Sequence, residues 1–117
     1  MRIQIIPCLQ DNYSYLIIDE KKNIACVIDP SEADPIIEYL ENNNIKLKFI
    51  LNTHHHYDHV GGNKKLKEKY KASVLGFKGD KERIPEIDIL LNDQETWKYE
   101  NFEAKIIHIP GHTLGHI

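Results

Sequence analysis

Four of the chain's seven histidines lie in one segment, THHHYDH at residues 53–59. If the backbone is extended there, His54 and His56 point to the same side, because side chains two residues apart in a strand share a face. Two imidazoles on one side can hold one metal ion, whereas His55 between them would point away. Asp58 and His59 would face a second ion next to the first. A carboxylate combined with imidazoles suits zinc, iron or manganese, so we predict a metal centre here.

A second segment of candidate ligands, PGHTLGH at residues 110–116, lies at the far end of the chain. His112 follows a Pro-Gly turn after an apolar run, and such loops place side chains at the edge of a sheet. As a third ligand it would leave one position of the first ion open for water, as in catalytic zinc sites. Two neighbouring ions can share that water, lower its pKa toward neutral and polarise a carbonyl group. The chemistry indicated is hydrolysis of an acyl bond or an ester, without a serine or cysteine nucleophile.

Plainer interpretations of the same residues remain open. A histidine-rich loop can simply be solvated, and Asp58 could cap the helix that follows it. His108 lies in an apolar segment and is expected to be partly buried with its hydrogen bonds satisfied. His116 could support the metal site or have only a structural role.

The elements that position these segments follow from the apolar patterns. Asp34-Pro35 reads as an N-cap followed by proline at the first helical position, and a second helix is expected over about 60–70. Residues 77–95 are polar and fit no single element, and a turn is expected at 10–12. A β-rich start followed by a βαβα order predicts a mixed sheet with helices on a face, in an α/β or α+β layered domain. The expected strands are 2–6, 13–18, 24–28, 47–51, 73–75, 96–99 and 104–109.

Length and composition narrow the class of protein. With 117 residues and 41% apolar content, the chain suits one globular domain. A net charge of −3 does not favour nucleic acid as a partner. The chain has no long apolar run, and residues 1–7 are too short and too polar for a secretory signal, so we expect no membrane span and a cytoplasmic location. Cys8 and Cys26 are therefore expected to be buried free thiols rather than a disulfide.

The candidate ligands also resemble a known family. The pattern His54-x-His56-x-Asp58-His59 matches the H-x-H-x-D-H signature of the metallo-β-lactamase superfamily. Asp29, at the end of an apolar strand, is similar to the aspartate of that superfamily's first motif, which lies near the metals without binding them. Residues 110–113 are similar to the third motif, which supplies the last histidine of the first metal site. Within the superfamily, residues 11–13, 53–59 and 110–116 most resemble glyoxalase II, the hydroxyacylglutathione hydrolases.

The resemblance covers the whole chain and implies a fold, a reaction and a ligand set. It implies an αββα sandwich, two metal ions (zinc, with iron or manganese as alternatives) and hydrolysis of S-D-lactoylglutathione to D-lactate and glutathione. His54, His56 and His112 would bind the first metal, and Asp58 and His59 would contribute to the second. Metal-bound hydroxide, with Asp58 in the catalytic set, would attack the thioester carbonyl.

The family continues beyond the point where this sequence ends. It adds an aspartate that bridges both metals, a further histidine for the second metal, and a helical region with most of the glutathione contacts. We therefore expect residues 1–117 to form a single incomplete domain, roughly the first sheet and its helices, with the second metal site weak or empty. A second copy or a separate C-terminal half could replace the missing structure. Three functions stay open: a truncated or split thioester hydrolase, a non-catalytic metal-binding remnant or assembly module, and a lactonase, other thioesterase or nuclease of the same superfamily.

Overall fold

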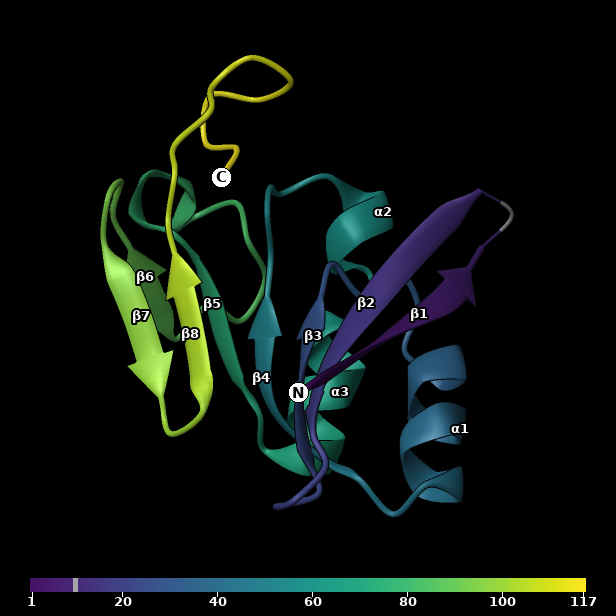
Figure 1. Cartoon of the computed structure of the whole chain (residues 1–117). Coiled ribbons are helices and arrows are strands. Elements are labelled where there is room, and N and C mark those ends of the chain that lie inside the picture. The colour runs from purple at the N-terminus through teal and green to yellow at the C-terminus, as the bar shows by residue number, and fades with distance from the viewer. Residues whose placement is uncertain (10) are drawn as a thin grey trace.

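The computed structural model describes residues 1–9 and 11–117 (Figure 1), so the turn expected at 10–12 lies partly outside the described residues. Its strands are β1 (Arg2–Cys8), β2 (Asn12–Asp19), β3 (Ile24–Ile28), β4 (Lys46–Leu51), β5 (Ser73–Phe77), β6 (Ile89–Leu91), β7 (Thr96–Tyr99) and β8 (Phe102–Lys105). The first six form one sheet in the order β1-β2-β3-β4-β5-β6, and the last two form a separate hairpin.

The six-stranded sheet is mixed, as expected. Strands β1, β2 and β3 pair antiparallel, whereas β3, β4, β5 and β6 pair parallel. Parallel neighbours need crossover connections, which are supplied by α1 (Asp34–Asn42) before β4 and by α2 (Tyr57–Val60) and α3 (Asn63–Tyr70) before β5. The carboxyl ends of β3, β4 and β5 therefore meet at one edge of the sheet, and the loops that follow them lie close together.

The two faces of the sheet are covered by different elements (Figure 1). Along β3, Ala25 and Val27 pack with the buried residues of α1 and α3, among them Ile36 and Leu66. Their neighbours Ile24 and Cys26 belong to a second apolar cluster on the opposite face. That cluster includes side chains of the β7–β8 hairpin, so the hairpin covers part of the face that the helices do not. Because both faces of β3 are buried, its sequence is continuously apolar rather than alternating.

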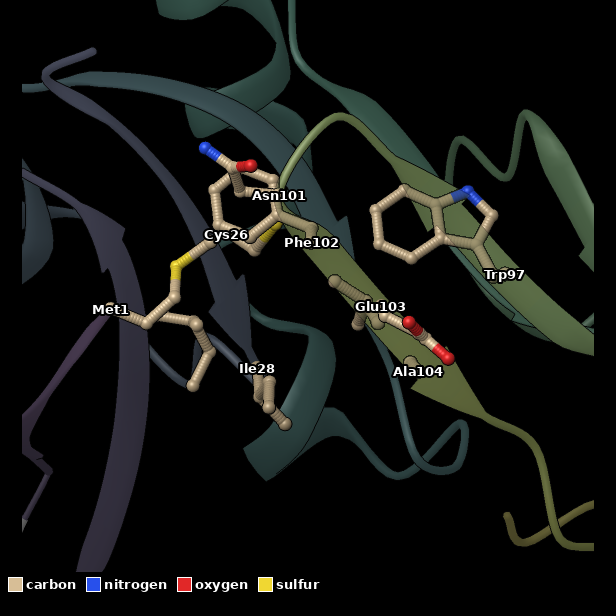
Figure 2. Close-up of a pocket in the computed structure, with 10 residues that line it drawn as sticks. Met1, Cys26, Ile28, Trp97, Asn101, Phe102, Glu103 and Ala104 are labelled. Atoms are coloured by element: carbon tan, nitrogen blue, oxygen red, sulfur yellow. The ribbon is translucent and has the colours of Figure 1, made fainter. Parts of the chain in front are cut away.

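A hollow of about 320 Å³ separates part of the sheet from the hairpin (Figure 2). Cys26 and Ile28 line it from the sheet, and Trp97 and Phe102 line it from the hairpin. Its lining is mostly apolar and includes none of the histidines, so it is separate from the predicted metal centre.

On the strands at one edge of the sheet, four large side chains are exposed: Ile3, Ile5, Tyr13 and Tyr15.

The structure corrects three details of the expected elements. The helix expected over 60–70 begins only at Asn63, as α3, because the chain turns at Gly61 and Gly62; Val60 instead ends the separate short helix α2. The strand expected over 104–109 ends at Lys105, and the residues after it have no regular structure. Asp34 is not an N-cap: Ala33 occupies that position, and the Asp34 carboxylate instead pairs with the Lys65 ammonium.

Two further expectations about the chain can be compared with the structure. Cys8 and Cys26 are both buried free cysteines, as predicted. Among the described residues, no helix is both long and apolar enough to span a membrane. In the segment that the sequence left unassigned, the structure contains the short helix η1 (Lys78–Asp80) and the three-residue strand β6.

Candidate metal centre

The predicted ligand segments meet at the edge where the parallel strands end. Strand β4 leads directly into His54, and the chain end is attached beside it, because the Ile117 N–H donates to the Thr53 carbonyl at 2.9 Å. The Ile109 N–H donates to the His116 carbonyl at 2.8 Å, which closes residues 109–116 into a compact loop. Two segments that are far apart in sequence are therefore held against each other, and the loop carries His112 to the histidines of residues 54–59.

His54, His56 and His112 form a group with metal-binding geometry. One ring nitrogen from each lies within 4.8 Å of the others. The ring centroids are 5.0 Å apart for His54 and His56, and 4.5 Å apart for His56 and His112. His54 is buried, and its Nε2 has no hydrogen-bond partner among the described residues. A buried nitrogen without a partner costs about 1–3 kcal/mol, and three converging imidazole nitrogens are a donor set that zinc accepts, so these residues fit a metal ion.

Thr53 fixes which nitrogen of His54 faces that group. The Thr53 hydroxyl lies 2.8 Å from His54 Nδ1 and donates its hydrogen to the Asp29 carboxylate at 2.6 Å. Because a hydroxyl has a single hydrogen, it must accept from His54, so Nδ1 carries the proton. Burial, together with the surrounding histidines, lowers the pKa of His54 to about 4. The ring is therefore neutral near neutral pH and presents an unprotonated Nε2, which is the form that binds metal.

Asp29 organises the residues behind the histidines. Its carboxylate also accepts from the Thr53 N–H at 2.8 Å and lies 3.1 Å from His59 Nδ1. Burial raises the pKa of Asp29, and the hydrogen bonds from Thr53 and the neighbouring His59 oppose that rise. Asp29, His54 and His59 form a second group whose ligand atoms lie within 4.8 Å of one another. Asp29 thus holds His59 by Nδ1 and leaves its Nε2 available.

Asp58 lies next to that free nitrogen. Its Oδ2 is 3.7 Å from His59 Nε2, and its side chain is 51% exposed. The Asp58 backbone carbonyl accepts hydrogen bonds from Asn12 Nδ2 at 2.9 Å and from the Ser31 hydroxyl. These contacts anchor the start of α2, and the carboxylate itself stays about half exposed. Asp58 and His59 therefore lie side by side. Among the described residues, His59 belongs to the group with Asp29 and His54, and Asp58 belongs to neither three-residue group.

A buried pair of asparagines is hydrogen-bonded to the backbone of the histidine-rich segment 53–59. Asn63 Nδ2 donates to Asn52 Oδ1 at 2.6 Å, and Asn52 Nδ2 donates to the His59 carbonyl at 3.2 Å. Sequence reasoning missed Asn52, Asn63 and Ser31. Asn52 gave one signal that could have been used: it is a polar residue directly after a buried strand and directly before the candidate ligands.

The remaining histidines have distinct environments. His55 belongs to neither ligand group. His108 is half-buried, stacks on Phe77 with ring centroids 4.3 Å apart, and its Nε2 lies 2.7 Å from the Leu114 carbonyl, so it is satisfied as predicted although it lies outside a strand. His116 stacks on His54 at 4.6 Å, and its Nδ1 is buried without a partner among the described residues.

The sequence is similar to a known protein family and to known enzymes. Residues 10–117 match the family model described as "Metallo-beta-lactamase superfamily". The chain is 79% identical over 117 residues to a hydroxyacylglutathione hydrolase from Pelagibacter ubique (strain HTCC1062). The alignment covers 100% of this chain and 49% of that protein. It is 42% identical over 117 residues to a hydroxyacylglutathione hydrolase from Methylococcus capsulatus, with 46% of that protein covered. The chain therefore spans about half the length of the curated relatives it matches.

Solved structures show the same arrangement of strands and helices. The crystal structure of BLEG-1 B3 metallo-beta-lactamase superposes with a TM-score of 0.89 at 20% identity, over 98% of this chain and 65% of that one. ETHE1 from Myxococcus xanthus superposes with a TM-score of 0.82 at 22% identity, over 99% of this chain and 52% of that one. At these identities the likeness shows the fold.

Proposed function

Since this chain belongs to the metallo-beta-lactamase superfamily, we propose that it carries the histidine-rich part of the metal centre of a thioester hydrolase. The observation that carries the proposal is the convergence of His54, His56 and His112, whose ring nitrogens lie within 4.8 Å of one another. The orphaned Nε2 of His54 supports it, because a bound ion would supply the partner that this buried atom lacks. The fold, one sheet with its helices on one face, is a scaffold that brings the two ligand loops together.

We assign each side chain a role from its position. His54, His56 and His112 would hold the first ion, and Asp29 would keep His59 oriented through Nδ1 without binding metal itself. Asp58, beside His59 and open to solvent, would orient the attacking water by accepting a hydrogen bond at Oδ2. When bound here, a divalent ion such as zinc, iron or manganese supplies Lewis-acid chemistry, which polarises a carbonyl group and lowers the pKa of water.

The proposed substrate is a glutathione thioester. The support is the similarity to a hydroxyacylglutathione hydrolase, which is 79% identical over 117 residues. The reaction would be S-D-lactoylglutathione plus water, giving D-lactate and glutathione. Since the match covers 49% of that relative, contacts to the glutathione moiety are proposed to come from polypeptide outside these residues.

The second metal position is proposed to be weaker than the first. Asp58 and His59 supply two ligands there, whereas catalytic zinc sites usually have three protein ligands. We therefore expect about one tightly bound ion for each chain of this length. Further ligands from a longer polypeptide, a second copy or a complementary half would raise the occupancy of the second position.

One experiment tests the metal centre and the reaction together. The purified protein, loaded separately with zinc, iron and manganese, would be assayed on S-D-lactoylglutathione while metal content is measured by mass spectrometry. The proposal expects bound metal and turnover that both disappear in His56→Ala. Bound metal with no turnover for any of the three metals would overturn the hydrolase and leave a non-catalytic metal-binding module. A protein that binds no metal would overturn the metal centre itself.

A further inference from the structure

Asp80 is a fully buried carboxylate that the proposed chemistry does not use. It ends η1, in the loop that follows β5, and its exposed fraction is 0%. Its Oδ1 lies 3.2 Å from a guanidinium nitrogen of Arg83, whose own side chain is 52% exposed. Its Oδ2 has no hydrogen-bond partner among the described residues. A buried carboxylate is costly unless it is paired, so the location of this group requires an explanation.

The ring of His55 lies close to the unpartnered oxygen. Asp80 Oδ2 and His55 Nδ1 are 3.5 Å apart. Both atoms are buried, and neither has another partner among the described residues. A movement of a few tenths of an ångström would make them a hydrogen-bonded pair, which removes two unsatisfied buried atoms at once. His55 lies between His54 and His56, so the pair would fix the backbone that carries both ligands.

The same carboxylate also lies against the loop that carries His112. A Cβ added at Gly115 would lie 2.3 Å from Asp80 Cγ and from both of its oxygens. Gly115 is therefore a site of close approach, where the absence of a side chain allows the Asp80 carboxylate to pack against the loop. Phe77, three residues before Asp80, adds a second contact to this part of the chain through its ring stacked on His108.

We propose that Asp80 is a positioning residue for the metal centre, which holds the backbone of His54 and His56 through His55 and holds the His112 loop through Gly115. The two ligand segments come from distant parts of the sequence, and Asp80 contacts both of them. The inference rests on the proposed function of the same site. It assigns to a buried residue, far from the signature in sequence, the task of bringing three ligands into register.

The test compares metal binding in Asp80→Asn and Glu82→Gln. The first variant keeps the size of the side chain and removes the carboxylate, and the second removes a charge from an exposed side chain two residues away. Co²⁺ affinity would be measured by chelator competition, and the Co²⁺ absorption spectrum would report the ligand geometry. Loss of a residue that orients metal ligands typically weakens affinity about 10- to 100-fold. We expect a loss of that size and an altered spectrum in Asp80→Asn, with Glu82→Gln unchanged.

Two single variants, His55→Ala and Gly115→Ala, keep the proposal testable if Asp80→Asn fails to fold. His55→Ala should bind one Co²⁺ with reduced affinity. If Asp80→Asn does fold, the double variant His55→Ala/Asp80→Asn should lose no more affinity than the single variants, because both substitutions break the same link. Gly115→Ala should weaken binding by forcing the loop away from Asp80. Wild-type affinity and spectrum in Asp80→Asn, or in His55→Ala and Gly115→Ala, would overturn the proposal.

A metal-free measurement separates this inference from the proposed function. Nitrogen NMR of the wild-type protein should show His55 protonated at Nδ1, with a shift that changes in Asp80→Asn and not in Glu82→Gln. If the wild-type protein binds no Co²⁺, the proposed metal centre fails while the Asp80–His55 link is still decided by these spectra. A His55 spectrum that is unaffected by Asp80→Asn would overturn the link itself.

Discussion

Thr53 donates to both carboxylate oxygens of Asp29, from its N–H to Oδ1 at 2.8 Å and from its hydroxyl to Oδ2 at 2.6 Å. This pair joins the carboxyl end of β3 to that of β4, one residue before His54. Because the hydroxyl must accept from His54 Nδ1 while it donates to Asp29, the pair also sets the tautomer of a proposed ligand. The architecture of the sheet and the chemistry of the site are therefore connected through one carboxylate.

Replacing Asp29 should destabilise the protein. Asp29→Asn tolerates the left-handed backbone found here, φ 52°, but places an amide donor opposite a donor of Thr53. The loss of a buried acceptor should lower the free energy of unfolding by about 1–3 kcal/mol, measured by urea denaturation without metal. Thr53→Ser keeps both donors and serves as the control. Equal stability of Asp29→Asn and Thr53→Ser would contradict this prediction.

The three-histidine group makes different predictions for adjacent residues. His56→Ala and His112→Ala should each abolish tight binding of the first ion, because two imidazoles remain where three converge. His55→Ala should still bind one ion at saturating metal, since His55 belongs to neither ligand group. Calorimetric titration with zinc would measure affinity and stoichiometry separately. Complete loss of binding in all three variants would show that the ligand set is wrong.

Gly62 should not tolerate a side chain. A Cβ at this position would lie 3.0 Å from three backbone atoms, among them the Pro30 carbonyl oxygen, which accepts the Gly62 N–H at 2.7 Å. Backbone atoms cannot move aside cheaply, so Gly62→Ala should reduce the free energy of unfolding by about 1–3 kcal/mol. Gly111→Ala is the matched control, because a Cβ there would meet nothing within 4 Å. Thermal denaturation of the two variants would distinguish them, and equal melting temperatures would count against the close contact.

Much of the site was predictable because its signals are local. The apolar run of residues 24–28 predicts β3 with the bounds that the structure has, and His54 and His56 are paired by spacing alone. Asp80 gave no such signal, because its burial arises from contacts with His55 and Gly115, which are distant in sequence. The strand β6 was missed for a similar reason: three residues are too few to show a period, and its position is fixed by pairing with β5.

The cysteines should be unreactive in the folded protein. Burial raises the pKa of the Cys26 thiol to about 12, and its exposed fraction is 2%, as is that of Cys8. Since the thiolate is the reactive form, the raised pKa leaves little of it at Cys26 at neutral pH, and both side chains are almost fully buried. A thiol reagent added at neutral pH should modify neither residue quickly, whereas both should react in strong denaturant. Rapid modification of a thiol before unfolding would contradict the buried assignment.

Asp88 should make stability depend on acid pH. Its carboxylate accepts from the Lys67 ammonium at 2.7 Å and from the Val74 N–H at 2.9 Å, which joins α3 to β5. Burial raises the pKa of Asp88, but the hydrogen bonds from these two donors lower it by more, so the pKa lies below its ordinary value in the folded protein. The folded state therefore favours the ionised form. The resulting stability is fully present above the unfolded pKa of about 3.9 and is lost as the pH falls through the lower folded value.

The variant Asp88→Asn tests this dependence. The Asp88 side chain is 36% exposed, so solvent screening limits the effect, and we expect a loss of about 1 kcal/mol at neutral pH. Urea denaturation should show a smaller difference from the wild type at acid pH, because protonation removes the same interaction from the wild-type protein. Glu68→Gln, on the exposed surface of α3, controls for the loss of one negative charge. A difference between Asp88→Asn and the wild type that stays constant, or grows, as the pH falls would show that Asp88 does not act through its charge.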